Sequence, residues 1–212
     1  MADATTTTTA ANTENLTDAM HYLTEALIQN GIDTMYGVIG IPVTDFSRVA
    51  QGKGIKYVGM RHEADAGNAA QAHAFVTGQP GVYLTVSAPG FLNGLPPLLE
   101  ATENGYPVIM IGGSSTRDIV DMGQGDYEGL DQMSYAKQFA KFSLRVDKIE
   151  DIPVAVARAM HYACSGRPGG VYIDFPGETM GQTMDKDEAL ANLWAATQPK
   201  AVMPPAQASI DQ

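Results

Sequence analysis

The chain has 212 residues, of which 44% are hydrophobic and 17% are charged, and its formal net charge is −11 at pH 7. This length and composition predict one domain with a core of its own and short tails. They exclude a nucleic-acid-binding protein, because lysine and arginine form no run that could contact phosphates, and a membrane span, because no segment approaches roughly 18 consecutive apolar residues.

The two ends of the chain differ in composition from its middle. Residues 1–14 include a threonine run at 5–9 and have neither the basic start nor the apolar centre of a signal peptide, so we expect a disordered tail. Residues 181–212 become rich in proline and polar side chains and are expected to be a linker leading out of a domain that spans 15–180. Cys164 is the only cysteine, which excludes a disulfide framework and favours a cytoplasmic location.

Strand and helix patterns alternate along the domain. Helical spacing of apolar residues predicts a first helix over 16–30, ending at Gly31. Short apolar runs predict strands at 34–38, 57–59, 82–86, 108–111, 143–146 and 171–174. Further helices are expected at 43–50, 63–77, 92–104, 130–136 and 152–163. The alternation predicts a doubly wound α/β fold, with a mostly parallel sheet and helices on both of its faces.

Glu63 is the strongest candidate for chemistry. It lies between an apolar strand at 55–59 and a helix of small residues that lets another backbone approach closely. A carboxylate there is partly desolvated and can keep a hydrogen bond to a heterocyclic nitrogen that an exposed glutamate would lose to water. The alternative is a glutamate that only complements the helix dipole from the first turn.

Several common catalytic motifs are absent. His62 and Glu63 begin like a zinc-binding HExxH motif, but Ala66 stands where the second histidine would be, and no metal site is predicted. The chain contains neither a GxGxxG fingerprint nor a Walker A loop, and no GxSxG nucleophile elbow. Nicotinamide-dependent, nucleoside-triphosphate-dependent and serine-hydrolase activities therefore have no support.

Five short motifs together point to a known family. They are YGVIGIP at 36–42, RHE at 61–63, PGV at 80–82, VSAPGFLN at 86–93 and GDYEGLDQM at 125–133. In order and spacing they resemble the pyrimidine-binding domain of thiamine-diphosphate-dependent decarboxylases and lyases, and within that family they look most like the oxalyl-CoA decarboxylases. The similarity runs from about Leu16 to Pro176. It implies conversion of oxalyl-CoA to formyl-CoA and CO₂.

The resemblance also implies roles for particular residues. Glu63 would hydrogen-bond the pyrimidine ring nitrogen of thiamine diphosphate, so that the aminopyrimidine can remove a proton from the cofactor's own thiazolium ring. Pro89 and Asn93 would line the pyrimidine pocket. Ile41 would lie beside the reacting carbon, in contact with both cofactor and substrate, where an apolar neighbour favours loss of CO₂.

Three more residues take expected roles from the same resemblance. Tyr127 would meet the substrate carboxylate or an ordered water, and Glu128 would be its acidic catalytic neighbour; a solvated acidic loop is the alternative. Arg167 would help to bind ADP as an activator, or else pair with a surface carboxylate.

The family's second half has no counterpart in the chain. These enzymes hold the diphosphate and Mg²⁺ through a Gly-Asp-Gly segment in another domain, beyond a middle domain, and neither is found here. The expected partners are oxalyl-CoA and the diphosphate-binding domain of a second subunit, in a homo-oligomer built as a dimer of dimers, with the helix at 63–77 facing that subunit. Two alternatives remain open: a 2-hydroxyacyl-CoA lyase, and a non-catalytic subunit that completes a partner's site.

Overall fold

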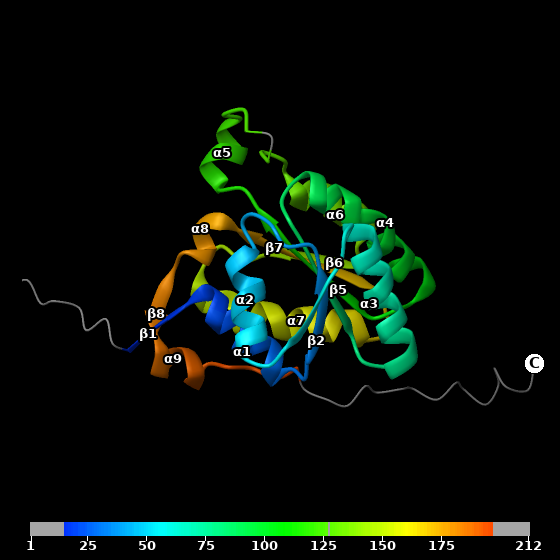
Figure 1. The fold of residues 1–212 in the computed structure, drawn as a ribbon, viewed down its shortest axis with the longest axis horizontal. Helices are drawn as coiled ribbons and strands as arrows, with labels where there is room; N and C mark the ends of the chain where they lie inside the picture. Colours follow the sequence, from blue (N-terminus) through cyan, green and yellow to red (C-terminus); the bar gives the residue numbers. More distant parts are fainter. Residues whose placement is uncertain (1–14, 127, 197–212) are drawn as a thin grey trace, which may run out of the picture.

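Six parallel strands in the order β3-β2-β4-β5-β7-β6 form the centre of the molecule in the computed structural model, which describes residues 15–126 and 128–196 (Figure 1). The strands are β2 (Thr34–Gly37), β3 (Lys56–Gly59), β4 (Gly81–Thr85), β5 (Val108–Ser114), β6 (Phe142–Arg145) and β7 (Gly170–Pro176). Every pairing in this sheet is parallel. The predicted doubly wound α/β fold is confirmed.

Helices cover both faces of the sheet. One layer contains α1 (Ala19–Gln29), α2 (Thr44–Gly52) and α7 (Ile152–Cys164), and the other contains α3 (Glu63–Thr77), α4 (Pro89–Asn104) and α6 (Gln132–Phe139). Strand β5 shows how the sequence supplies two cores: Ile109 and Ile111 pack in the first layer, and Val108 and Met110 in the second. Successive side chains of a strand point to opposite faces, so a strand covered on both sides is apolar throughout.

Short elements complete the described chain. They are β1 (Leu16–Asp18), α5 (Arg117–Met122), the 3-10 turn η2 (Ile149–Asp151), α8 (Gly177–Met180), β8 (Thr183–Asp185) and α9 (Lys186–Ala191). Within residues 15–126 and 128–196, no helix combines the length and apolar character needed to cross a bilayer.

The start of the first predicted helix was wrong. Residues 16–18 form β1, which pairs antiparallel with β8, and the helix begins only at Ala19. Asp18 has extended backbone angles, φ −97° and ψ 167°, and its carboxylate accepts a hydrogen bond from the backbone N–H of His21. Asp18 is therefore the N-cap of α1, which stabilises a helix start at the following residue.

The segment expected to be a linker, 181–212, contains regular structure at its beginning. Strand β8 and helix α9 occupy residues 183–191 and lie beside β1, at the left of Figure 1. The expected tail at 1–14 and the end of the chain at 197–212 lie outside the described residues.

The small residues of α3 serve close packing within the chain. A Cβ built on Gly67 would lie 2.3 Å from Cγ of Pro97 in α4, and one built on Gly81 in β4 would lie 2.0 Å from the carbonyl oxygen of Ala70. Helix α3 thus approaches both α4 and the sheet at backbone distance. This packing fixes the start of α3, and with it Glu63, against the start of α4.

Candidate active site

Glu63 is the first residue of α3 and is almost fully buried, with 6% of its surface exposed. The side chain of His62 already caps the helix, because its Nδ1 accepts a hydrogen bond from Ala64 N at 3.2 Å. A glutamate that only complemented the helix dipole would gain nothing from this burial, since desolvation disfavours its charge. The location suits a carboxylate that binds a ligand.

Asn93 joins Glu63 from the neighbouring helix. Its Nδ2 donates to Oε2 of Glu63 at 3.2 Å, which connects the first turns of α3 and α4. No group in residues 15–126 and 128–196 donates a hydrogen bond to the other oxygen, Oε1. Glu63 is thus held by one oxygen and keeps the second available.

Two glycines and a valine in mutual contact lie next to the second oxygen. A Cβ built on Gly90 would lie 2.7 Å from Oε1 of Glu63 and 2.3 Å from Cγ2 of Val86, and one built on Gly40 would lie 2.6 Å from Cγ1 of Val86. Val86 therefore packs between two glycines, and the one in α4 borders the carboxylate. The backbone of Gly90 therefore packs directly against the Glu63 carboxylate, closer than any side chain at position 90 would allow.

Ile41 directly follows Gly40, the second glycine that contacts Val86. Its side chain is 68% exposed, and its carbonyl oxygen accepts a hydrogen bond from Oγ of Ser87 at 3.5 Å. The peptide bond to Pro42 is cis, and Pro42 packs over Gly113 at the end of β5. The structure thus brings the segments at 40–42 and 87–93 together with Glu63, as the sequence predicts for groups that follow parallel strands.

Tyr57 of β3 adds a buried phenol near this edge. Its hydroxyl has no hydrogen-bond partner among the described residues, and it packs against Gly37, where a Cβ would lie 2.6 Å away. Burial raises the pKa of Tyr57, and the charge of Glu63 raises it further. The phenol therefore stays protonated at neutral pH.

The acidic loop between α5 and α6 is not joined to Glu63 by the contacts described. Tyr127 lies outside the described residues. The backbone N–H of Glu128 donates to Oδ1 of Asp126 at 3.3 Å, and its carbonyl accepts from Leu130 N at 2.8 Å. These bonds are local, so the roles expected for Tyr127 and Glu128 stay predictions.

Arg167 lies near the opposite end of α4. Its guanidinium donates to the carbonyl of Thr102 at 3.0 Å and to that of Glu103, at the C-terminus of that helix. Carbonyls of a last helical turn have no intrahelical partner, so this arginine stabilises the helix end. The surface carboxylate pairing considered as an alternative is not what these two bonds show, and the ADP role stays a prediction.

Sequence reasoning did not single out two residues that shape the site, Val86 and Gly90. Both lie in the 86–93 motif, but neither carries a functional group, so only their contacts with Gly40 and Glu63 reveal their part. Glycine directly after a proline at a helix start is the one local signal that a close approach was needed there.

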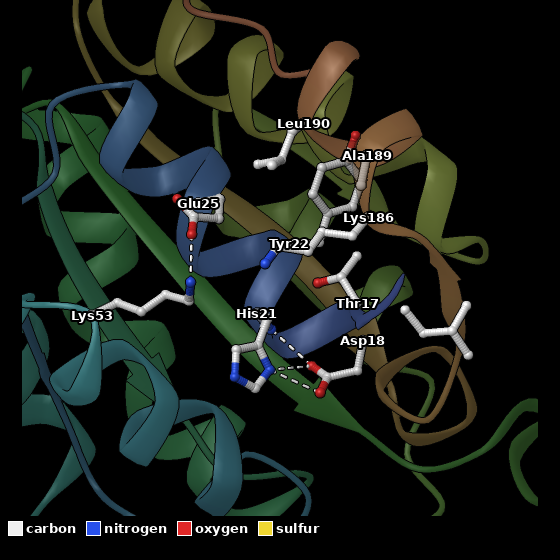
Figure 2. Close-up of a pocket in the computed structure, with 10 residues that line it drawn as sticks. Thr17, Asp18, His21, Tyr22, Glu25, Lys53, Lys186, Ala189 and Leu190 are labelled. Atoms are coloured by element: carbon white, nitrogen blue, oxygen red, sulfur yellow. Dashed lines mark hydrogen bonds and ion pairs between the residues drawn. The ribbon is translucent and has the colours of Figure 1, made fainter. Parts of the chain in front are cut away.

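A separate hollow of about 270 Å³ lies between α1, β1 and α9 (Figure 2). Four of its ionisable side chains form two pairs: Lys53 Nζ lies 2.5 Å from Glu25 Oε1, and His21 Nδ1 lies 2.8 Å from Asp18 Oδ2. None of the residues predicted for catalysis or cofactor binding lines it. We place the candidate active site at Glu63 because burial, close glycine contacts and an available carboxylate oxygen coincide there.

A known family matches the part of the chain that contains Glu63. The model of the thiamine pyrophosphate enzyme N-terminal TPP binding domain matches residues 17–135, which include Glu63, Pro89 and Asn93. The chain belongs to this family. Helices α3 and α4, and the strands that precede them, all lie in the matched part of this TPP binding domain.

Relatives of the domain have two kinds of name. The chain is 55% identical to the oxalyl-CoA decarboxylase of Escherichia coli (strain K12), over 92% of this chain and 35% of the relative. It is 40% identical to the 2-hydroxyacyl-CoA lyase of Oryza sativa subsp. japonica over 97% and 36%, and 37% identical to 2-hydroxyacyl-CoA lyase 1 of Homo sapiens over 80% and 29%. The chain spans about a third of the length of these curated relatives.

The residues at Glu63 fit the family's cofactor. Asn93 holds Oε2 of Glu63, whereas no group in the described part of the chain donates to Oε1, and Gly90 beside Oε1 packs against the apolar Val86. A heterocycle with one basic nitrogen matches such a site. No group of three or more His, Cys, Asp or Glu side chains in the described part of the chain is arranged to hold a metal ion.

Proposed function

We propose that this chain is the pyrimidine-binding half of a thiamine-diphosphate-dependent oxalyl-CoA decarboxylase. In that reaction the bond between the carboxylate and thioester carbons of oxalyl-CoA breaks, CO₂ leaves and a proton takes its place to give formyl-CoA. The observation that carries the proposal is the buried carboxylate of Glu63, whose Oε2 is held by Asn93 and whose Oε1, next to Gly90, accepts no hydrogen bond from the described residues.

Glu63 acts on the cofactor's pyrimidine ring. Its Oε1 would hold the ring nitrogen opposite the amino group through a hydrogen bond, which the low exposure of the carboxylate would strengthen relative to water. Asn93 keeps the carboxylate in one orientation through Oε2. When bound, thiamine diphosphate supplies the carbon nucleophile and the electron sink that the loss of CO₂ requires.

The neighbouring residues shape the space around the reacting groups. Pro89 and Gly90 form the wall at the start of α4, and Ile41 presents an exposed apolar side chain at the same edge. An apolar surface there excludes water from the substrate carboxylate and favours its conversion to neutral CO₂. Tyr127 and Glu128 are proposed to reach the substrate carboxylate, and Arg167 to bind ADP.

A second subunit completes the proposed enzyme. Its diphosphate-binding domain would hold the diphosphate and Mg²⁺, in a cytoplasmic homotetramer arranged as a dimer of dimers. The exposed apolar side chains of α3 and α4 support contact with another chain: Phe75 is 71% exposed, Val76 80% and Leu92 45%. A soluble monomer rarely leaves several large apolar side chains so exposed on adjacent helices.

The experiment compares oxalyl-CoA turnover by this chain alone and together with a diphosphate-binding half, with thiamine diphosphate and Mg²⁺ present. We expect formyl-CoA only when both halves are present, and a loss of at least 100-fold in Glu63→Gln, which keeps the shape but removes the shared proton. Turnover near the wild-type rate in Glu63→Gln would refute the assignment.

A second candidate activity is that of a 2-hydroxyacyl-CoA lyase, which the 40% identity over 97% of the chain favours. The same preparations, given a 2-hydroxyacyl-CoA in competition with oxalyl-CoA, separate the two activities. The lyase assignment replaces the decarboxylase if kcat/KM is higher for the 2-hydroxyacyl-CoA. A non-catalytic role is indicated if neither substrate is consumed while thiamine diphosphate still binds.

A further inference from the structure

Ala88 introduces a strained turn immediately before the active-site helix α4. Within residues 15–126 and 128–196 it is the one non-glycine residue with a positive φ, at 43° with ψ −92°. No side chain caps the start of this helix. A residue with a Cβ avoids such angles unless its surroundings impose them, and such residues cluster at functional sites.

The side chain of Gln132 holds this turn in place. Its Oε1 accepts a hydrogen bond from Ala88 N at 2.7 Å, and its Nε2 donates to Gly113 O at 3.0 Å and to Tyr172 Oη at 2.7 Å. A backbone N–H only donates and a carbonyl only accepts, so these partners fix which end of the amide faces Ala88. Gln132 is 1% exposed, and all three of these side-chain hydrogen bonds are buried.

Further bonds, buried at Tyr172 and exposed at Asp131, hold Gln132 itself. Tyr172 Oη donates to Oδ1 of Asp174 at 2.9 Å, and Oδ2 of Asp174 accepts from Nε of Arg145 at 2.5 Å. Arg145 also reaches Oδ1 of Asp131, at 3.4 Å, and Asp131 directly precedes Gln132. The bonds therefore form a closed ring through α6, β6 and β7 that returns to Gln132.

The turn at Ala88 sets the geometry around Glu63. Helix α4 begins one residue later and carries both Gly90, whose backbone borders Oε1 of Glu63, and Asn93, which donates to Oε2. A shift of the turn moves both groups relative to the carboxylate. None of the hydrogen bonds that hold Gln132 involves Glu63, Gly90 or Asn93.

We propose that Gln132 is a positioning residue for the pyrimidine site: by holding the Ala88 turn it fixes Gly90 and Asn93 against Glu63. This inference rests on the proposed function, because it assigns a purpose to the position of Glu63. Gln132 contacts neither substrate nor cofactor and acts only through the backbone of α4.

The test uses Gln132→Met, which keeps the length of the side chain and removes its three hydrogen bonds. The matched control is Thr179→Val, which removes one buried hydroxyl bond, from Oγ1 of this α8 residue to Val146 O at 2.9 Å. Both variants are expected to lose thermal stability, because each removes buried hydrogen bonds. Dissociation constants for thiamine diphosphate are measured by calorimetry with the diphosphate-binding half present, and backbone hydrogen exchange is measured over residues 86–93.

We expect Gln132→Met to raise the dissociation constant roughly 10-fold and lower kcat roughly 10- to 100-fold, because small misplacements at a site cost this much. Its exchange over 86–93 becomes faster, while Thr179→Val matches the wild type in all three. If Gln132→Met fails to fold, Tyr172→Phe removes one bond to the amide and is expected to raise the dissociation constant about 3-fold.

The outcomes separate the two proposals. Provided that Glu63→Gln has lost its activity, the positioning role is overturned if folded Gln132→Met keeps the wild-type affinity and kcat. If Gln132→Met does not fold, wild-type affinity in Tyr172→Phe overturns it instead. Wild-type turnover in Glu63→Gln overturns the proposed function itself.

Discussion

Asn93 and Glu63 are joined by a hydrogen bond of 3.2 Å between Nδ2 and Oε2, which links the first turns of two helices that follow different strands. The bond leaves Oε1 as the oxygen that faces Gly90. Because Glu63 is buried, its orientation is set by this one partner and by packing. The chemistry proposed for the site therefore depends on Asn93 as well as on the carboxylate.

Asn93→Ala removes the donor without adding charge or bulk. We expect the affinity for thiamine diphosphate to fall roughly 10- to 150-fold, since one hydrogen bond to a charged group contributes about 1.5–3 kcal/mol. Asn93→Asp is expected to be worse, because two carboxylates at this distance repel each other. Calorimetric titration with the diphosphate-binding half present measures both; equal affinity in Asn93→Asp and the wild type would contradict the role assigned to this amide.

Gly90→Ala tests whether the close packing of the α4 backbone against the Glu63 carboxylate is needed for activity. The added Cβ would stand 2.7 Å from Oε1 of Glu63 and 2.3 Å from Cγ2 of Val86, so one of them must move. We expect at least a 100-fold loss of turnover, because a displacement of about 1 Å at a reacting group costs this much.

Gly52→Ala is the matched control for that substitution. Gly52 lies in α2, and a Cβ there would meet nothing within 4 Å. Alanine is favoured over glycine in a helix by about 0.5–1 kcal/mol, so this variant should be slightly more stable and fully active. Full activity in Gly90→Ala would show that catalysis does not depend on the close packing of Gly90 against Oε1.

The central sheet could be predicted from the sequence because its strands are short apolar runs and its helices have apolar residues at helical spacing. Each of these signals is local. Strands β1 and β8 have only three residues each and pair across a sequence separation of about 170, as Leu16 does with Asp185, so no local pattern announces them.

The site divides in the same way. The position of Glu63 after a strand predicts that it meets other groups at the carboxyl ends of parallel strands, and the structure confirms that grouping for Asn93 and the segment at 40–42. Its role came from resemblance to a family. The bond between Gln132 and Ala88 joins residues 44 positions apart, and only the folded structure brings them together.

Arg145→Met is expected to lower the free energy of unfolding more than the loss of a surface ion pair does. Asp174 is fully buried and accepts its ion pair from Nε of Arg145 at 2.5 Å, with side-chain exposures of 1% and 19%. Burial lowers the pKa of Arg145, but the hydrogen bond to Asp174 and the charge of Asp174 outweigh this and raise the pKa above its ordinary value. Leaving a buried carboxylate unpaired costs about 3–5 kcal/mol.

Chemical denaturation measures that loss, with Arg48→Met as the matched control. The pair of Arg48 and Asp45 has side-chain exposures of 76% and 62%, so its removal should change stability by less than about 0.5 kcal/mol. Adding Asp174→Asn to Arg145→Met is expected to restore part of the loss. Equal effects of Arg145→Met and Arg48→Met would contradict the importance given to burial.

Asp18 gives the fold a dependence on acid that can be removed without removing its cap. Burial raises the pKa of its carboxyl, but bonds from the backbone and ring of His21 outweigh this and lower the pKa below its ordinary value of 3.8. A lowered folded-state pKa means that the charged carboxylate stabilises the fold above about pH 4, and that this contribution is lost as the pH falls through the folded-state pKa.

Asp18→Asn keeps an N-cap acceptor but cannot be protonated in this range. We expect the urea midpoint of the wild type to rise more than that of the variant as the pH is raised from below the lowered folded-state pKa of Asp18 to pH 6, because only the wild type gains the charge. Exposed Asp45→Asn, which changes the same charge in the first turn of α2, serves as the control for net charge. An equal gain in Asp18→Asn and the wild type would mean that the bonds between Asp18 and His21 do not stabilise the fold through the charge.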